Sequence, residues 1–259
     1  MNKTQLERHL SSLPLSSIRY YDTIGSTNDE ALTWASQGAP DLSLIVADEQ
    51  TSGRGRMDRK WFTPPNSALA MSLILRPTTM EQTHPSRTTG LLALSLVESL
   101  LRLGLAPKIK WPNDVLLEGR KVAGILVETA WMGEKLDALV LGMGVNILTT
   151  SVPPADQVLF PATSIESELG YSVERIELLK DILTKMLEWR PNLGTTAFLK
   201  AWEENLAFRG QQVRVEAGSG ESIVGELLGL GLDGSLRLHN EHGKSVTVRF
   251  GEVHLRPLA

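Results

Sequence analysis

The chain lacks three features, and each absence excludes a class of function. It has no cysteine, which excludes disulfides, cysteine-ligated zinc and thioester chemistry carried by the protein itself. No apolar run approaches the roughly 20 residues of a membrane span, and residues 1–17 lack the apolar core of a signal peptide. A basic surplus is also missing, since the net charge is -4 and the pI about 5.8. We therefore expect a cytoplasmic protein that binds neither membranes nor nucleic acid.

Apolar patterning over the 259 residues predicts an α+β protein in which a large unit precedes a small one. The predicted strands cover 43–50, 67–77, 108–131 (interrupted by two turns) and 135–148, and the predicted helices cover 2–10, 85–104 and most of 163–209. After Gly210, apolar and polar residues alternate around glycine turns, which is typical of a small antiparallel barrel. We place a domain boundary there and predict domains at 1–209 and 210–259.

The segment SGRGRMDRKWF, residues 52–62, is a basic loop in an acidic protein. Gly53 and Gly55 permit positive φ, so successive backbone N–H groups can point at one oxyanion. Planar cationic donors for phosphate or carboxylate, and an aromatic face for a base, come from Arg54, Arg56, Arg59 and Trp61. Taken alone, the run favours a solvated loop that flanks a core tryptophan.

A second cluster changes this balance. KWPND, residues 110–114, combines a lysine, an indole, a turn, an amide and a carboxylate, and Lys121 follows at the start of an apolar strand. A lysine in that position pays a desolvation cost unless an anion pairs with it. Alone, Lys121 fits a snorkelling structural role equally well, and Asp114 fits a turn cap better than a catalyst. Together the two clusters supply the groups needed to bind a nucleotide and an acid.

Two weaker patterns do not carry a function. GLGLDG, residues 229–234, has dinucleotide-binding glycine spacing, but the strand-like SLRLHN follows it, so a hairpin turn is predicted. The histidines are scattered, and the neighbouring His239 and His242 lack an acidic cluster at ligand spacing. We therefore expect no metal site made of protein ligands alone.

In their order along the chain, GRGRMDRKW, KWPND and KVAGIL resemble the motifs of the biotin–protein ligases. The family pattern is Gly-Arg-Gly-Arg-x-Gly-Arg-x-Trp, Lys-Trp-Pro-Asn-Asp and Lys-x-Ala-Gly-Ile-Leu. STN at 26–28, Gln50, GMGVN at 142–146 and GEVHLR at 251–256 match as well, so the resemblance runs from about residue 19 to 258. Asp58 departs from it, standing where the family often has glycine, and we expect its side chain to point outward or to pair with Arg59.

The resemblance implies a fold and a reaction. The fold is a mixed sheet flanked by helices, as in class II synthetases, with a small C-terminal SH3-like β-barrel. The reaction uses Mg²⁺ with ATP: biotin and ATP give biotinyl-5'-AMP, and biotin then passes to a lysine of a biotin carboxyl carrier protein. About twenty residues precede the pattern, so we expect the monofunctional form, without the N-terminal winged-helix DNA-binding domain of some members. A homodimer is plausible because family members associate through a sheet edge.

The resemblance also assigns residues to tasks. Biotin binding falls to Ser26, Thr27, Asn28, Gln50, Arg54, Gly55, Arg56 and Lys121. ATP or AMP binding falls to Arg54, Arg56, Arg59, Trp61, Asn113, Lys121, Asn146, Glu252 and Arg256. Catalysis falls to Arg56, Lys121 and Asp114, with Asp114 guiding or deprotonating the incoming lysine. Trp61 is expected to cover the adenine and Asn146 to hydrogen-bond its edge. Residues 25–29, GSTND, also fit a helix start capped by Ser26 or Thr27.

Three alternatives remain open. A lipoate–protein ligase or octanoyl transferase shares the fold and the carrier lysine, although the Gly-Arg-Gly-Arg loop with KWPND fits biotin better. A non-catalytic module would use the 210–259 barrel for binding, but the intact Arg56 and Lys121 speak against a degenerate ligase site. A DNA-binding repressor would need the N-terminal domain.

Overall fold

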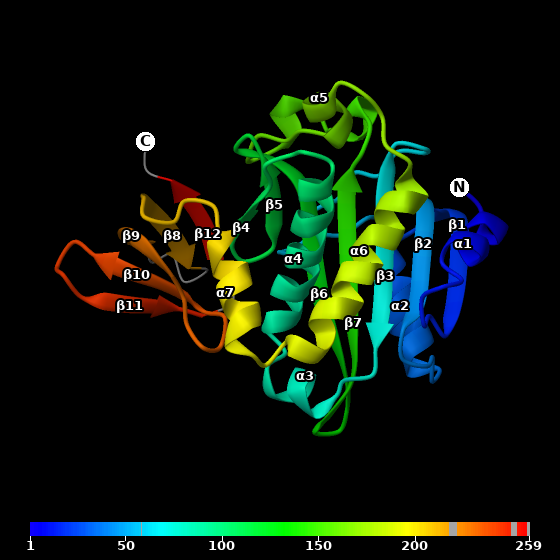
Figure 1. Ribbon diagram of the computed structural model, residues 1–259, viewed down its shortest axis with the longest axis horizontal. Coiled ribbons are helices and arrows are strands. Elements are labelled where there is room, and N and C mark those ends of the chain that lie inside the picture. Colours follow the sequence, from blue (N-terminus) through cyan, green and yellow to red (C-terminus); the bar gives the residue numbers. More distant parts are fainter. Residues whose placement is uncertain (58, 218–221, 250–252, 258–259) are drawn as a thin grey trace.

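The computed structural model describes residues 1–57, 59–217, 222–249 and 253–257 (Figure 1). The helices are α1 Lys3–His9, α2 Thr27–Ser36, α3 Thr79–Thr83, α4 Arg87–Arg102, α5 Ile165–Leu169, α6 Arg175–Trp189 and α7 Thr196–Glu204, with 3-10 turns η1 Thr149–Ser151, η2 Ala155–Gln157 and η3 Arg190–Asn192. The strands are β1 Ser17–Ile24, β2 Ser43–Gln50, β3 Ala68–Leu75, β4 Lys108–Lys110, β5 Asp114–Leu117, β6 Arg120–Met132, β7 Lys135–Asn146, β8 Gln212–Ala217, β9 Ser222–Leu230, β10 Leu236–Asn240, β11 Ser245–Val248 and β12 Val253–Pro257.

Seven strands form one mixed sheet in the order β1-β2-β3-β7-β6-β5-β4. Only β1 and β2 run parallel in it, and the other neighbours are antiparallel. The central strands β3 and β7 are buried along almost their whole length, whereas β6 is buried only in part. This mixed sheet with flanking helices confirms the predicted fold class.

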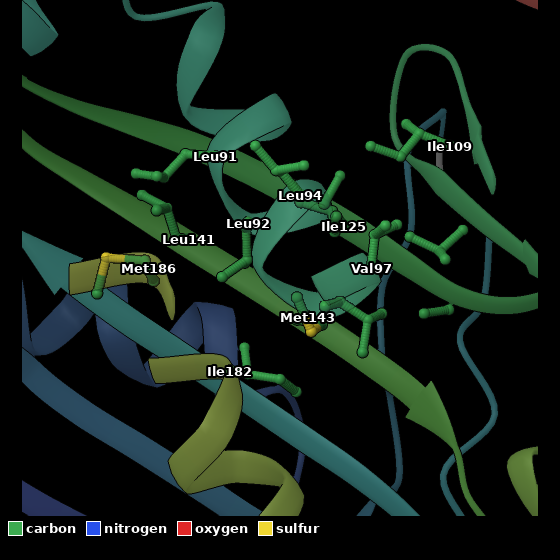
Figure 2. Close-up of a cluster of buried hydrophobic side chains, with 14 of the residues drawn as sticks. Leu91, Leu92, Leu94, Val97, Ile109, Ile125, Leu141, Met143, Ile182 and Met186 are labelled. Carbon is green, nitrogen blue, oxygen red and sulfur yellow. The ribbon is translucent and has the colours of Figure 1, made fainter. Parts of the chain in front are cut away.

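Helices α4 and α6 cover one face of this sheet (Figure 1). Figure 2 shows Leu92, Leu94 and Val97 of α4 packed near Met143 of β7 and Ile182 of α6. The α4 helix follows a proline, and it ends where Gly104, at φ +82°, turns the chain in the left-handed region. No helix in the described part of the chain is long and apolar enough to cross a membrane.

The opposite face is covered over part of its length by α2. Ala31 and Trp34 of α2 pack on Ile74 and Val140, which alternate along their strands with the residues that face α4. Beyond the N-terminus of α2, the sheet face is not covered by a helix in the described structure. This uncovered part of the sheet carries the site described below.

The last five strands form a separate antiparallel sheet in the order β11-β10-β9-β8-β12. It matches the small all-β unit expected after Gly210, and β9 and β10 confirm that GLGLDG lies at a hairpin. The turn between them docks on the rest of the molecule: Arg87 donates to the Leu193 and Leu232 carbonyls, and Trp111 Nε1 donates to the Gly234 carbonyl at 3.1 Å. The division into two domains at residue 210 stays a prediction.

Three elements differ from the sequence predictions. Strand β1 and helix α3 were not predicted, and α2 was expected only as a possible helix start. Ser26 occupies the N-cap position, but its hydroxyl makes no capping hydrogen bond within the described structure. Instead the Thr27 N–H donates to Gln50 Oε1 at 2.9 Å. A side chain from β2 thus caps the helix, because β2 ends beside the N-terminus of α2.

Candidate functional site

One pocket of about 520 Å³ lies against the uncovered part of the seven-stranded sheet. It brings together nearly all the predicted site residues: Ser26, Thr27, Asn28, Gln50, Arg54, Gly55, Arg56, Arg59, Trp61, Asn113, Asp114, Lys121 and Asn146. The segment 153–162, which the sequence did not indicate, contributes further to the wall. Motifs more than 100 residues apart in the chain therefore converge on one cavity of the size that suits a small molecule.

Two cross-strand rows form the floor of the pocket. The first row is Ser72, Gly142 and Leu126, and the second is Ala70, Gly144 and Gly124. A Cβ on Gly142 would overlap the Asn28 amide, and one on Gly144 would overlap the Trp61 indole. The glycines thus let two polar or aromatic side chains lie directly on the strand backbone.

Trp61 lies over the second row, in contact distance of Gly124 and Gly144. The Lys121 ammonium is 5.4 Å from the centroid of its ring. The indole Nε1 is buried and has no hydrogen-bond partner in the described structure. A Cβ on Gly144 would overlap this nitrogen, so the Nε1 edge of the indole rests on the strand backbone.

The residues at the N-terminus of α2 form a hydrogen-bonded row with strands β2 and β3. Thr27 Oγ1 donates to Gln50 Oε1 at 3.1 Å, and Ser72 Oγ lies 2.8 Å from Thr27 Oγ1 and 2.6 Å from Asn28 Oδ1. Ser26, Thr27 and Asn28 are all at most 4% exposed. Their positions are therefore fixed by packing before any ligand binds.

The basic loop is a small hairpin, which corrects the expected role of its glycines. Neither Gly53 nor Gly55 has positive φ. Gly53 O accepts from Trp61 N–H at 2.8 Å, and Gly55 N–H donates to Arg59 O at 2.7 Å, so the Gly55 N–H serves the hairpin instead of an anion. Gly53 is required for close approach, because a Cβ there would lie 2.5 Å from Trp61 O. Asp58, with its expected pairing to Arg59, lies outside the described residues.

Arg54 and Arg56 leave the hairpin toward different partners. Arg54 Nη2 pairs with Glu128 at 2.8 Å and with Asp29 at 2.6 Å. Arg56 Nη1 donates to Asn113 Oδ1 at 3.2 Å. Burial lowers the pKa of Arg56, and although the nearby Asp114 opposes this effect, the net direction is downward. The guanidinium remains charged at neutral pH and lies in the pocket as a desolvated cation.

Lys121 has the anionic partner that its position required. Its Nζ is 2.6 Å from Asp114 Oδ1, and Lys110 Nζ is 3.6 Å from the other carboxylate oxygen. Burial alone would raise the pKa of Asp114, but the two ammonium groups outweigh it and hold the pKa below its usual value. Lys110 also sits 4.1 Å above the Phe160 ring. Asp114 is therefore a carboxylate clamped between two cations.

The remaining predicted residues are placed as follows. Asn113 braces its turn, since Nδ2 donates to Ile125 O and its carbonyl accepts from Ile125 N–H, both at 2.9 Å. Asn146 is buried and donates to Thr163 O at 3.0 Å. Arg256 lies on β12 in register with Arg214, but its side chain and the whole of Glu252 lie outside the described residues.

Sequence reasoning missed several residues that support the site. Ser72, Glu128 and Asp29 contact predicted site residues but were assigned no task from the sequence. Gly142 and Gly144 had a usable signal, because glycines two apart in a strand leave one face bare. Among the described residues no group of three His, Asp or Glu side chains is placed to hold a metal ion.

Comparison with known proteins identifies the family. Residues 20–146 match the model of the "Biotin/lipoate A/B protein ligase family". The chain is 35% identical to the biotin--[acetyl-CoA-carboxylase] ligase of Paracoccus denitrificans, over 85% of this chain and 93% of that one. It is 32% identical to the bifunctional ligase/repressor of Bacillus subtilis, over 86% of this chain and 70% of that one. The structure of the Aquifex aeolicus biotin protein ligase in complex with biotin and ATP superposes with a TM-score of 0.81 at 26% identity, covering 94% of this chain and 100% of that one. The chain therefore belongs to the family of biotin protein ligases.

Proposed function

We propose that this protein joins biotin to a lysine of a biotin carboxyl carrier protein, using ATP and passing through biotinyl-5'-AMP. The observation that carries the proposal is the single pocket that unites the α2 N-terminus, the basic loop, KWPND and Lys121. Relatives of this chain are biotin ligases, and the structure of one is known in complex with biotin and ATP. The lipoate alternative is disfavoured by the same relatives.

In the first step the biotin carboxylate attacks the α-phosphorus of ATP and pyrophosphate leaves. Two anions must approach each other, so fixed cations are needed where negative charge gathers. Arg56 and Lys121 line the pocket and supply them, and each is oriented by a neighbour, Asn113 for Arg56 and Asp114 for Lys121. We assign them to the phosphate and carboxylate oxygens of the reacting groups.

In the second step the neutral amine of the acceptor lysine attacks the acyl carbon and AMP leaves. The resemblance gave Asp114 two possible tasks, guiding the acceptor lysine or deprotonating it. The lowered pKa of Asp114 makes it a weak base, which disfavours proton abstraction. Its contact with Lys121 instead favours orienting Lys121 and guiding the acceptor lysine as it approaches. We therefore assign Asp114 a guiding role.

We assign the adenine end of the nucleotide to Trp61 and Asn146, which line the same pocket, with Arg59 near the phosphates. Glu252 and Arg256 are proposed to close over the nucleotide from the small sheet. Mg²⁺ belongs to the proposal only as an ion bound to the ATP phosphates, since the described residues provide no cluster of acidic ligands for it. The cytoplasm, where ATP is abundant, is the proposed location. Association of two copies through a sheet edge also stays a prediction.

Exchange of labelled pyrophosphate into ATP tests the first step. We expect exchange with biotin, and none with lipoate or octanoate. Labelled biotin should then pass to a carrier protein, and a carrier whose acceptor lysine is changed to arginine should remain unlabelled. Exchange with lipoate or octanoate alone would move the assignment to the related ligases, and no exchange with any acid would refute it.

A further inference from the structure

The side-chain amide of Asn28 is held by partners whose hydrogen-bonding character cannot change. Its Nδ2 donates to Glu128 Oε2 at 2.8 Å and to the Leu126 carbonyl at 3.2 Å. A carbonyl and an ionised carboxylate can only accept, so this end of the amide must be the nitrogen. Its Oδ1 then accepts from Ser72 Oγ at 2.6 Å. The partners thus define the orientation of an amide that lies directly on Gly142.

Glu128 is held in place by Arg54. The guanidinium Nη2 lies 3.0 Å from one carboxylate oxygen and 2.8 Å from the other, and Asp29 contacts the same nitrogen at 2.6 Å. A charge-assisted pair of this kind, with both carboxylate oxygens on one guanidinium nitrogen, holds the carboxylate in one orientation. Glu128 therefore presents an oxygen to Asn28 in a fixed position.

The other end of the row is fixed by the backbone. The Thr27 N–H can only donate, and it points at Gln50 Oε1, so the Gln50 amide also has one orientation. The Thr27 hydroxyl donates to that same oxygen, and the Ser72 hydroxyl lies between Thr27 and Asn28. The Gln50 and Asn28 amides at the two ends of this row thus each have one orientation, and both amino hydrogens of Asn28 are already used.

We propose that Glu128 is a positioning residue that, together with the Leu126 carbonyl, makes Asn28 an obligatory acceptor in the pocket. Asn28 can then offer a ligand only the second lone pair of Oδ1, so the ligand must present an N–H there. This inference rests on the proposed function and adds the source of its substrate preference. The cyclic urea of biotin carries two N–H groups, whereas a dithiolane ring or an alkyl chain carries none.

The variant Glu128→Gln tests the proposal. A glutamine can donate as well as accept, so in this variant only the Leu126 carbonyl, at 3.2 Å from Nδ2, still opposes reversal of the Asn28 amide. Pyrophosphate exchange would be measured with biotin and with two cyclic carbamate analogues, each having one ureido N–H replaced by oxygen. In the unchanged protein, kcat/KM should be about 10²-fold or more higher for biotin than for the carbamate whose ring oxygen replaces the N–H that faces Asn28. That carbamate places its ring oxygen against Asn28 Oδ1, so two hydrogen-bond acceptors oppose each other.

In Glu128→Gln this selectivity should fall about tenfold, chiefly through KM, with kcat changed less than about threefold. A ratio of kcat/KM values does not depend on the folded fraction, so partial unfolding cannot imitate the result. Glu128→Asp, which withdraws the carboxylate by one methylene, makes the same test if the glutamine variant does not fold.

Asp29→Asn is the matched control. It removes the other carboxylate from Arg54, and in the described structure Asp29 makes no hydrogen bond to the Asn28 amide. Its selectivity should stay within about twofold of the unchanged protein. Equal selectivity in Glu128→Gln and the unchanged protein, or an equal loss in Asp29→Asn, would overturn the positioning role alone. Absence of biotin-dependent exchange in the unchanged protein would overturn the proposed function, and the inference with it.

Discussion

At the scale of single residues, Lys121 lines the pocket and forms an ion pair with Asp114. Replacing it by methionine removes the cation assigned to the first step, so biotin-dependent pyrophosphate exchange should fall about 10²- to 10³-fold. The matched control is Lys108→Met, which removes an exposed lysine from the nearby strand β4 and should leave the rate unchanged. Equal losses in the two variants would contradict the assignment.

Asp114 gives the molecule a measurable dependence on pH. Its pKa in the folded protein is below the usual value, so the ion pairs with Lys121 and Lys110 stabilise the fold above the ordinary aspartate pKa of about 4. That contribution is lost as pH falls through the folded pKa. Asp114→Asn should lower the free energy of unfolding by about 3 kcal/mol at pH 7. Urea titrations should show that the difference in the free energy of unfolding between the unchanged protein and Asp114→Asn becomes smaller below about pH 4. A difference that stays constant with pH would refute the linkage.

Single residues also mark the limit of prediction from sequence. The need of Lys121 for an anion follows from its apolar neighbours, and Asp114 satisfies it across a β-hairpin seven residues away. Glu128 and Ser72 support Asn28 from 100 and 44 residues away, and no local pattern connects them. Such contacts depend on the register of central strands, which local sequence does not specify.

At the scale of elements, the glycine spacing of β7 determines the pocket floor. Gly144→Ala should push the Trp61 indole off the sheet, raise KM for the substrates and destabilise the fold by about 1–3 kcal/mol. The control is Gly25→Ala, since a Cβ at Gly25 meets nothing within 4 Å and the backbone there is not left-handed. Thermal unfolding and exchange kinetics of both variants make the test.

The basic loop should respond to its ligands. It carries Arg54, Arg56 and Lys60 toward a pocket that biotin and ATP would fill. Trypsin should therefore cleave within residues 51–60 more slowly when both substrates are present than when neither is. Cleavage after the exposed Lys200 of α7 provides the internal reference. Equal cleavage of the loop with and without substrates would show that it does not order over the adenylate.

Most elements followed from their sequences, and the exceptions have physical causes. The apolar run of β2 predicted its bounds without error. β1 was missed because an edge strand is only partly buried and its polar residues obscure the alternation. The Gly53 and Gly55 conformations were predicted wrongly, since glycine serves close approach as well as positive φ, and composition does not distinguish the two.

At the scale of the whole molecule, hydrogen bonds from Arg87 and Trp111 hold the β9–β10 turn of the small sheet against the larger part of the molecule. Arg87 is 3% exposed and donates to two carbonyls, one of them in that turn. Arg87→Met leaves both acceptors unpaired, so the free energy of unfolding should fall by about 2 kcal/mol. Arg237→Met, an exposed change on β10 of the same sheet, should stay within about 0.5 kcal/mol. Denaturant titrations distinguish them, and equal shifts would remove the fastening role.

The bare floor of the pocket also restricts how this enzyme can be altered to accept new substrates. Gly142 and Gly144 already have the smallest side chain, so no substitution can deepen the cavity beneath the ligand. A bulkier head group, such as one bearing a chemical handle for protein labelling, needs space from the walls instead. Directed evolution for enlarged biotin analogues should therefore accumulate changes in the walls of the pocket and leave the two glycines untouched.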